Sequence, residues 1–207
     1  MLRSGSAETL FRLAFVAAFA VAVATTTARQ AVRRHGGTLN HLAHEVRGLI
    51  VVRAGLGLVF YSTLMAWLFW PQAIGGTYLA VPTAMRWLAV VLLGPALAFF
   101  AWSFRTLGTN YRGGVGLHGE HELVTTGPYR RIRHPIYAAF IGIMLLVLPL
   151  TANWLLGLSG LMLVLSVAAV RIPREERLLH ERFGPGWERY RERAGRLLPR
   201  LRFIEVP

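Results

Sequence analysis

Residues 136–172 read IYAAFIGIMLLVLPLTANWLLGLSGLMLVLSVAAVRI, and this stretch decides the fold. It contains no charged residue before Arg171. A helix needs about 20 mostly apolar residues to cross a bilayer, so residues 154–172 are long enough, whereas residues 136–150 are short for a span. The segment 149–153 between them contains proline and asparagine and is typical of a turn. The pattern predicts a tight helical hairpin that enters and leaves the membrane on one side.

Three more apolar segments precede the hairpin. They cover residues 10–28, 50–72 and 87–102, and the third extends upstream through Met85. Hydrophobic residues make up 54% of the chain and charged residues 16%, whereas soluble domains carry about 25% charged residues. We therefore predict an all-α integral membrane protein with about five transmembrane helices, a cytosolic loop and short C-terminal helices. Residues 1–104 would form a scaffold of three helices, and residues 105–207 a second unit with the loop, the hairpin and the tail.

The positive charge of the chain predicts how these helices are oriented. All 23 basic residues are arginines, the net charge is +13, and the arginines flank apolar segments. This placement argues against nucleic-acid binding, which needs a basic soluble surface. The arginines concentrate in residues 29–49, 103–135 and 171–202. Because basic loops stay on the cytoplasmic side, five spans with the N-terminus outside would put all three segments in the cytoplasm. The use of arginine without lysine is typical of a GC-rich genome, so we expect a multi-pass protein of a prokaryotic inner membrane.

The first apolar segment has some features of a signal peptide, with Arg3 before it and three threonines followed by Ala28 at its end. Cleavage there would invert the remaining spans and expose the basic loops outside. We therefore expect a retained helix. The chain has no cysteine, which excludes disulfides, thiol catalysis and cysteine-based metal sites.

Two patterns in the loop 103–135 match known sites in sequence pattern but lack the features that such sites require. Residues 114–119 read GVGLHG, which fits the dinucleotide fingerprint, but no strand precedes them and the required βαβ context is missing. His118 and His121 stand three apart beside two glutamates, yet no third ligand is evident, so no metal site is predicted.

The loop ends in a motif that suits an anion. Gly127-Pro breaks the chain, and His134-Pro135 begins the next helix with proline in its first turn, where its missing N–H costs little. The free N–H groups of that turn, next to arginines in the loop, suit a carboxylate. Those arginines are Arg130, Arg131 and Arg133. The alternative is a basic collar at the membrane surface.

A second charged cluster follows the hairpin. Arg171 and Glu175 are four apart and would share one helix face, and Glu176 and His180 repeat that spacing. Pro173 predicts a kink or break of the helix at that position. Carboxylates at the mouth of a membrane hairpin are costly unless they are paired or used, although a surface ion pair is the simpler reading. Farther on, Trp187, Tyr190 and Ala194 share a face, which suggests a short amphipathic helix lying on the membrane.

Taken in order, these segments resemble the isoprenylcysteine carboxyl methyltransferase family, in a wider group with phospholipid N-methyltransferases. The resemblance covers about residues 105–200, and its strength lies in the ordered series with these gaps. The segments are His121-Glu-Leu-Val124, Gly127-Pro-Tyr129, Arg133-His-Pro-Ile-Tyr137, Arg171 with Glu175-Glu176, Phe183-Gly184, Tyr190 and Pro199. The sequence departs from the family pattern at Ala138, where the family has glycine, and at Ala194-Gly195, where it has Val-Pro. Gly114 also stands where the family has a side chain that contacts the cofactor.

The resemblance implies a membrane methyltransferase that uses S-adenosylmethionine. It implies a cofactor pocket built from the loop, the hairpin and the C-terminal segment. The implied cofactor contacts are His121, Glu122, Leu123, Val124, Tyr129, His134, Pro135, Ile136, Tyr137 and Glu175. The resemblance also implies that Arg171 binds and orients the substrate and that Arg171 and Glu175 are the catalytic residues.

The acceptor and the class of function stay open at this level. A prenylated cysteine carboxylate, a phospholipid amine and a small thiol are all compatible acceptors, and each would be lipid-like or would meet the enzyme at the bilayer. A membrane reductase of the sterol-reductase type, which uses NADPH, has similar C-terminal helices. A non-catalytic membrane adaptor with a basic tail is the third class. The oligomeric state is not predicted.

Overall fold

The computed structural model describes residues 5–31, 47–108 and 123–200, and these residues are almost entirely helical. The long helices are α1 (Ser6–Ala31), α2 (Arg47–Phe69), α3 (Thr83–Leu107), α4 (Pro135–Thr151), α5 (Trp154–Phe183) and α6 (Pro185–Arg193). Two 3₁₀ helices, η1 (Pro71–Thr77) and η3 (Gly127–Arg130), lie in the connections. The described residues contain isolated β-bridges but no strand. The all-α prediction is confirmed.

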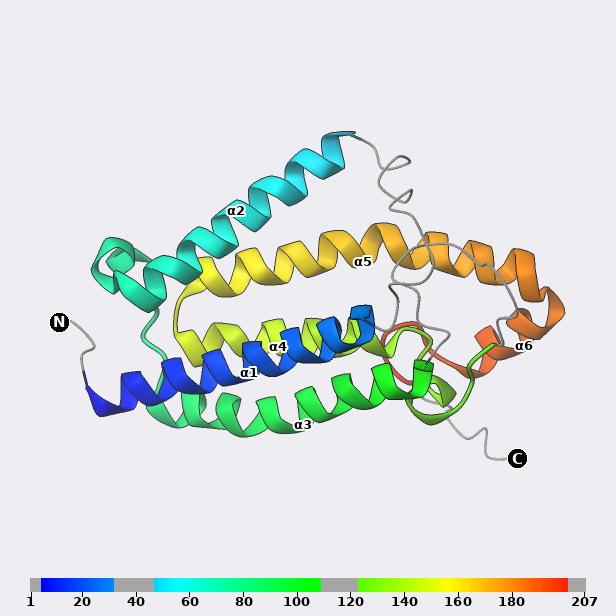
Figure 1. Cartoon of the computed structure of the whole chain (residues 1–207), viewed down its shortest axis with the longest axis horizontal. Helices are drawn as coiled ribbons and strands as arrows, with labels where there is room; N and C mark the ends of the chain where they lie inside the picture. The colour runs from blue at the N-terminus through cyan, green and yellow to red at the C-terminus, as the bar shows by residue number, and fades with distance from the viewer. Residues whose placement is uncertain (1–4, 32–46, 109–122, 201–207) are drawn as a thin grey trace, which may run out of the picture.

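Five helices run alternately in opposite directions along the long axis of the molecule (Figure 1). Four of them, α1, α2, α3 and α5, are long and apolar enough to cross a membrane. Helix α4 has 17 residues, and at 1.5 Å per residue it is about 25 Å long, somewhat shorter than the ~30 Å hydrocarbon core. The predicted membrane architecture is therefore confirmed, with α4 as the short arm of the hairpin.

The turn between α4 and α5 is fixed by its own side chains. Ala152 ends α4 in the left-handed conformation, with φ 50°. Asn153 begins α5, because its side chain accepts a hydrogen bond from the Leu156 N–H at 3.0 Å and thus satisfies one of the free donors of the first turn. Its amide also donates to Thr77 Oγ1 at 2.6 Å, which ties η1 to the turn. The sequence therefore encodes a tight hairpin, as predicted.

Helix α5 extends beyond the predicted end at Ile172 and continues to Phe183. A kink or a break was predicted at Pro173, and the break is therefore wrong. Proline removes one N–H donor, the partner of a single carbonyl group one turn earlier. On either side of it, buried Ile172 and the contacts of Glu175 hold both halves of the helix in place. As a result, one continuous helix joins the membrane hairpin to the charged end of the molecule.

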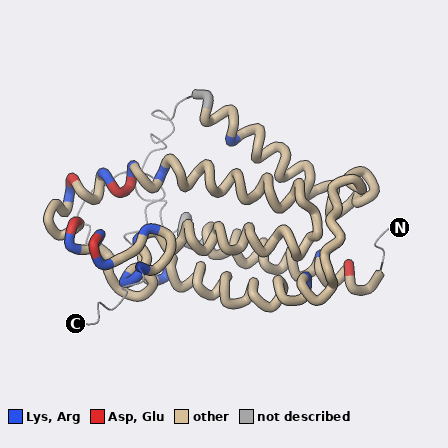
Figure 2. The backbone as a smooth tube through the Cα atoms, turned by 180° about the vertical axis from the view of Figure 1, so that it is seen from behind, with Lys and Arg blue, Asp and Glu red and all other residues tan. Residues whose placement is uncertain are grey.

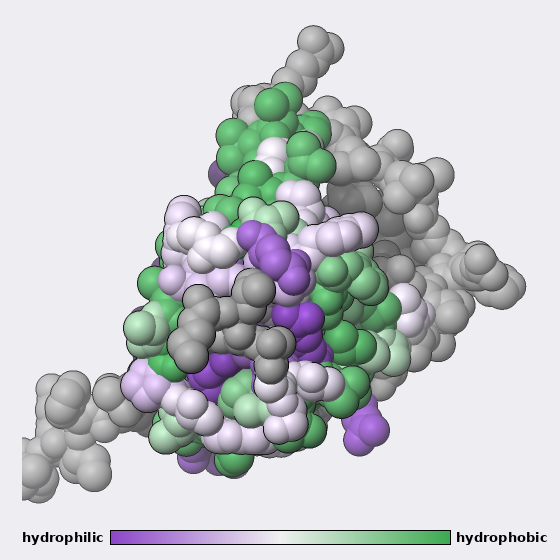
Figure 3. Space-filling view, turned by 90° about the vertical axis from the view of Figure 1, so that its left-hand side faces the viewer, coloured by the Kyte–Doolittle hydropathy of each residue, from purple (hydrophilic) through white to green (hydrophobic). Residues whose placement is uncertain are grey.

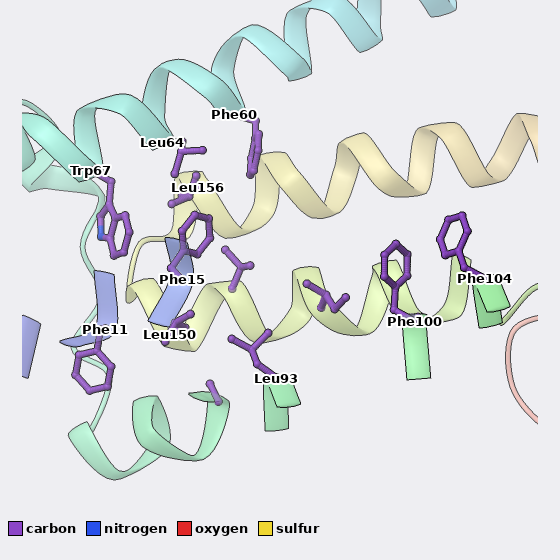
Figure 4. Packing of buried hydrophobic residues seen from close by; sticks show 14 residues of the cluster. Phe11, Phe15, Phe60, Leu64, Trp67, Leu93, Phe100, Phe104, Leu150 and Leu156 are labelled. Atoms are coloured by element: carbon purple, nitrogen blue, oxygen red, sulfur yellow. The ribbon is translucent and has the colours of Figure 1, made fainter. Parts of the chain in front are cut away.

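The core lies between the helices and is rich in aromatic side chains (Figure 4). Phe100 packs edge-on against Phe104, with ring centroids 4.8 Å apart, and against Phe140 at 4.6 Å, which joins α3 to α4. Glycine allows α5 to approach α4, because a Cβ on Gly157 would lie only 2.7 Å from the Cβ of Leu148. Large apolar side chains on the outer faces of the helices remain exposed, as expected for contact with lipid; among them are Leu13, Val51, Leu58 and Val91.

The two ends of the bundle differ in charge. Most charged residues of the described chain gather at the end that carries α6 and the end of α5 (Figure 2). The opposite end shows hydrophilic residues near its centre with hydrophobic ones around them (Figure 3). There Arg86 forms a buried ion pair with Glu8 at 2.8 Å, and its Nε donates to the Leu150 carbonyl at 3.0 Å. This pair joins α1, α3 and the end of α4.

Candidate active site

The candidate site lies at the charged end, where α4 begins. Residues 131–134 lead into α4 and are held by the C-terminal segment through an isolated parallel bridge. The Arg133 N–H donates to the Gly195 carbonyl at 2.8 Å, and the Gly195 N–H donates to the Arg131 carbonyl at 2.9 Å. The His134 N–H donates to the Arg196 carbonyl at 3.1 Å. These bonds fix the backbone from which His134 and the first turn of α4 project.

The start of α4 meets the second half of α5 in a cluster of polar side chains. Tyr137 Oη donates to Glu175 Oε1 at 2.8 Å. His134 Nδ1 lies 3.6 Å from Glu175 Oε2, and its Nε2 lies 3.2 Å from Glu176 Oε1. The loop ending in His134-Pro135 and the helix bearing Glu175 therefore converge, as their proposed shared site requires.

Arg171 stands one helical turn before Glu175. Its guanidinium lies near the Tyr137 phenol, which donates to the Glu175 carboxylate. The Glu175 side chain is 32% exposed, whereas that of Glu176 is 14% exposed. Of the two adjacent carboxylates, Glu175 is the one that a ligand can approach.

Glu176 is enclosed by cations. It accepts from Arg133 Nε at 3.0 Å and from Arg196 Nη2 at 2.7 Å, in addition to its contact with His134. Glu176 and His180, which are four residues apart, do not contact each other; His180 instead lies 3.8 Å from Glu188 with both side chains exposed.

The guanidinium of Arg133 makes several contacts within the protein. Besides Glu176, its guanidinium donates to the carbonyls of Arg191 at 3.0 Å and Ala194 at 2.6 Å, and it lies 6.0 Å from the Trp187 ring centroid. Its Nε and Nη1 donors are thus engaged by the protein, and a role for this arginine in binding a free anion stays a prediction. Arg130 and Arg131 are exposed.

The electrostatics of the cluster favour a charged histidine. Burial alone lowers the pKa of His134, but the close contacts with the Glu175 and Glu176 carboxylates and their negative charges outweigh burial, and the pKa is raised above its ordinary value of 6.5. The geometry agrees, because a neutral imidazole has one N–H and could donate to only one of the two carboxylates that face its ring nitrogens.

Helix α6 supports the cluster from the side. The predicted shared face of Trp187, Tyr190 and Ala194 is confirmed, and these residues are buried against Leu123, Leu179 and Phe183. Tyr190 Oη also donates to the Tyr129 carbonyl at 2.7 Å. The face is thus consumed by contacts within the protein, and the expectation that it lies on the membrane is wrong.

The other predicted cofactor residues fall into three groups. Pro135 is buried in the first turn of α4, and Ile136 packs against the main core. Tyr129 is buried, and Leu123 and Val124 are partly buried before η3. His121 and Glu122 lie outside the described residues.

Comparison with known proteins locates the same segment. Residues 83–181, which run from the start of α3 nearly to the end of α5, match the sequence profile of the Isoprenylcysteine carboxyl methyltransferase family. Two similar proteins, from the indica and japonica subspecies of Oryza sativa, are each named "Probable protein-S-isoprenylcysteine O-methyltransferase". Each is 30% identical over 120 residues, which are 57% of this chain and 60% of the relative, so the chain spans about 60% of the length of these relatives. The resemblance predicted from the sequence is thereby confirmed over residues 83–181, which are similar to the isoprenylcysteine carboxyl methyltransferase family.

Proposed function

We propose that the protein is an integral membrane methyltransferase that transfers the methyl group of S-adenosylmethionine to a lipid-like acceptor. The observation that carries this proposal is the convergence of His134 and Tyr137 with Arg171 and Glu175 at one end of a membrane bundle. All four residues lie inside the segment that matches the family.

The residues of the cluster fit the ends of such a donor. The amino-acid end of the donor carries an ammonium group and a carboxylate, and its sulfonium supplies an electrophilic methyl group. The partly exposed Glu175 carboxylate suits the ammonium group. The N–H groups of Ile136 and Tyr137 lie in the first turn of α4, where a helix has no partner for them, and they suit the carboxylate.

The acceptor needs orientation more than proton transfer. Methyl transfer from a sulfonium is an in-line displacement, so holding the two reactants in line can supply most of the rate. Arg171 has five N–H donors in a planar group, which can hold an acceptor carboxylate by a two-pronged pair. The exclusion of water by the surrounding helices would protect the donor.

The described charges favour an acceptor that is already ionised. An amine acceptor must lose a proton before it attacks, and this requires a base. Glu176 is held by two arginines and His134, and His134 is held charged by two carboxylates, so neither is suited to accept that proton. We therefore infer a carboxylate acceptor, such as that of the prenylated cysteine named for the relatives.

The distribution of charge supports a cytoplasmic active site. The arginine-rich tail and the cluster lie at the same end of the bundle (Figure 2), and basic segments stay on the cytoplasmic side of a prokaryotic inner membrane. The donor would enter from the cytoplasm, while a lipid-like acceptor would enter sideways from the bilayer.

Transfer of a radiolabelled methyl group by detergent-purified protein tests the proposal. The panel contains farnesylcysteine analogues, phospholipid amines and small thiols, and binding of NADPH is measured beside binding of S-adenosylmethionine. We expect labelled farnesylcysteine ester, and no NADPH binding. Binding of NADPH without methyl transfer would favour a reductase. If neither cofactor binds, the methyltransferase proposal fails and the result favours a non-catalytic membrane adaptor.

A further inference from the structure

Glu176 has the environment of a structural anchor. One of its oxygens, Oε1, accepts from Arg133 at 3.0 Å and faces His134 Nε2 at 3.2 Å, while the other, Oε2, accepts from Arg196 at 2.7 Å. Both oxygens are therefore occupied by protein donors. A carboxylate in this state is neither a free base nor a free ligand for a small molecule.

The imidazole of His134 connects Glu176 to Glu175. The ring is 5% exposed and lies between the two carboxylates, with one nitrogen toward each. The second oxygen of Glu175 accepts from Tyr137 at 2.8 Å. The orientation of the Glu175 carboxylate is thus set by the ring on one side and by the phenol on the other.

The C-terminal segment completes this chain of contacts. Arg196 lies beyond residues 83–181, the part that matches the family. It is carried to Glu176 by the bridge between Ile132 and Gly195. At Gly195 a side chain has no room, because a Cβ would lie directly against the Leu198 carbonyl oxygen and 3.0 Å from the Arg200 nitrogen. Glycine at this position, where the family has proline, allows the close return of the tail.

The geometry points to a positioning role for Glu176 and Arg196 in the proposed donor site: Arg196 holds Glu176, Glu176 holds the His134 ring with both nitrogens protonated, and the ring orients Glu175. This role rests on the proposed function, because Glu175 is the residue that would touch the donor. Glu176 and Arg196 act only through other residues.

The charges around His134 give the role a measurable signature. Glu175 and Glu176 face the ring from α5, and Tyr137 lies one turn along α4 with its ring centroid 6.0 Å away. The arginines of the cluster reach the carboxylates or the tyrosine; they are Arg133, Arg171 and Arg196. Removal of the Glu176 charge takes away one of the two groups that raise the pKa of His134, so the ring would lose its proton at lower pH.

Binding of S-adenosylmethionine, measured by calorimetry across a pH series, tests the role. In Glu176→Gln we expect affinity to fall about tenfold near neutral pH, the effect of losing one charged hydrogen bond. We also expect the alkaline loss of binding to begin at lower pH than in the wild type. Arg196→Gln should weaken binding about threefold, and Arg196→Lys should restore part of it.

Glu188→Gln is the matched control, because Glu188 also faces a histidine, His180, but both side chains are more than half exposed. Its pH profile should overlay that of the wild type. If Glu176→Gln overlays it as well, the positioning role is overturned while the proposed function stands. If the wild type binds no donor at any pH, the proposed function fails instead.

Nitrogen NMR of histidine-labelled wild-type protein tests the inference without relying on donor binding. The His134 signals, assigned with His134→Gln, should show two protonated ring nitrogens at pH 7. A single N–H with the other nitrogen unprotonated would overturn the inference directly.

Discussion

The two ends of the helical bundle each contain a buried carboxylate paired with arginine, and they use it differently. At the end shown in Figure 3, Glu8 is 7% exposed and pairs with a single cation, Arg86, whose guanidinium carbon lies 4.0 Å from the Phe11 ring centroid. At the opposite end, two adjacent carboxylates share a histidine. Glu176 also binds arginines from two segments, whereas Glu175 is 32% exposed. A buried carboxylate that is paired within the protein joins helices. A partly exposed carboxylate, held in place by buried neighbours, can instead bind a ligand.

The largest expected effect concerns the buried pair. Arg86→Ala leaves the Glu8 carboxylate buried without its cation and also frees the Leu150 carbonyl, so the free energy of unfolding should fall by about 3–5 kcal/mol. Denaturant unfolding in detergent micelles measures this change. A fall of less than about 1 kcal/mol, the range of exposed pairs, would show that the pair behaves as an exposed one.

The next effect concerns the partly exposed carboxylate. Glu175→Ala should weaken binding of S-adenosylmethionine about 100-fold, because it removes a charged partner worth about 1.5–3 kcal/mol. Its unfolding free energy should change less than that of Arg86→Ala, since Glu175 is partly exposed. Calorimetry and denaturant unfolding on the same preparation compare the two. Unchanged binding would show that Glu175 does not contact the donor, and the proposed difference between the two ends would then fail.

A smaller effect is expected at the phenol that orients this carboxylate. Tyr137→Phe loses the 2.8 Å hydrogen bond to Glu175 but keeps the ring, so donor affinity should fall about fivefold, the effect of one hydrogen bond of about 1 kcal/mol. A competition assay with unlabelled donor suffices to measure it. Equal affinity in the variant and the wild type would mean that His134 alone sets the orientation.

The smallest effect is the response of stability to pH. The pKa of His134 is raised by folding, so its contribution is fully present below the unfolded pKa near 6.5 and is lost as pH rises through the higher folded pKa. The unfolding free energy of the wild type should therefore decline over that alkaline window, and His134→Gln should show less decline. If the unfolding free energies of the two proteins changed with pH in the same way, the pH dependence would come from a group other than His134.

The helices could be predicted from the sequence because each apolar segment carries its own signal. The hairpin 136–172 and its turn at Asn153 follow from length, composition and capping alone. The end of α5 was missed because Pro173 is a local stop signal that contacts on both sides override. The face of Trp187 and Tyr190 was recognised, but periodicity gives a face and not its partner, which here is protein rather than lipid.

The candidate site could be predicted from the sequence only in part. The spacing of Arg171 and Glu175 and the family resemblance led to the meeting of α4 and α5, and the structure brings these residues together. The partners of Glu176 were not foreseen, because Arg133 lies 43 residues before it and Arg196 lies 20 residues after it. No local period connects such positions. The one available signal was Gly195, a departure from the family pattern whose backbone makes the bridge to Ile132.

The docking of residues 194–196 onto the start of α4 has a consequence for synthesis. These residues follow helices α1 to α5 in the chain, so the ribosome adds them after the other described parts of the cluster. A nascent chain can insert its helices while the pocket is still lacking the arginine that secures Glu176. The cluster at the proposed site can therefore be completed only after α5 has been synthesised.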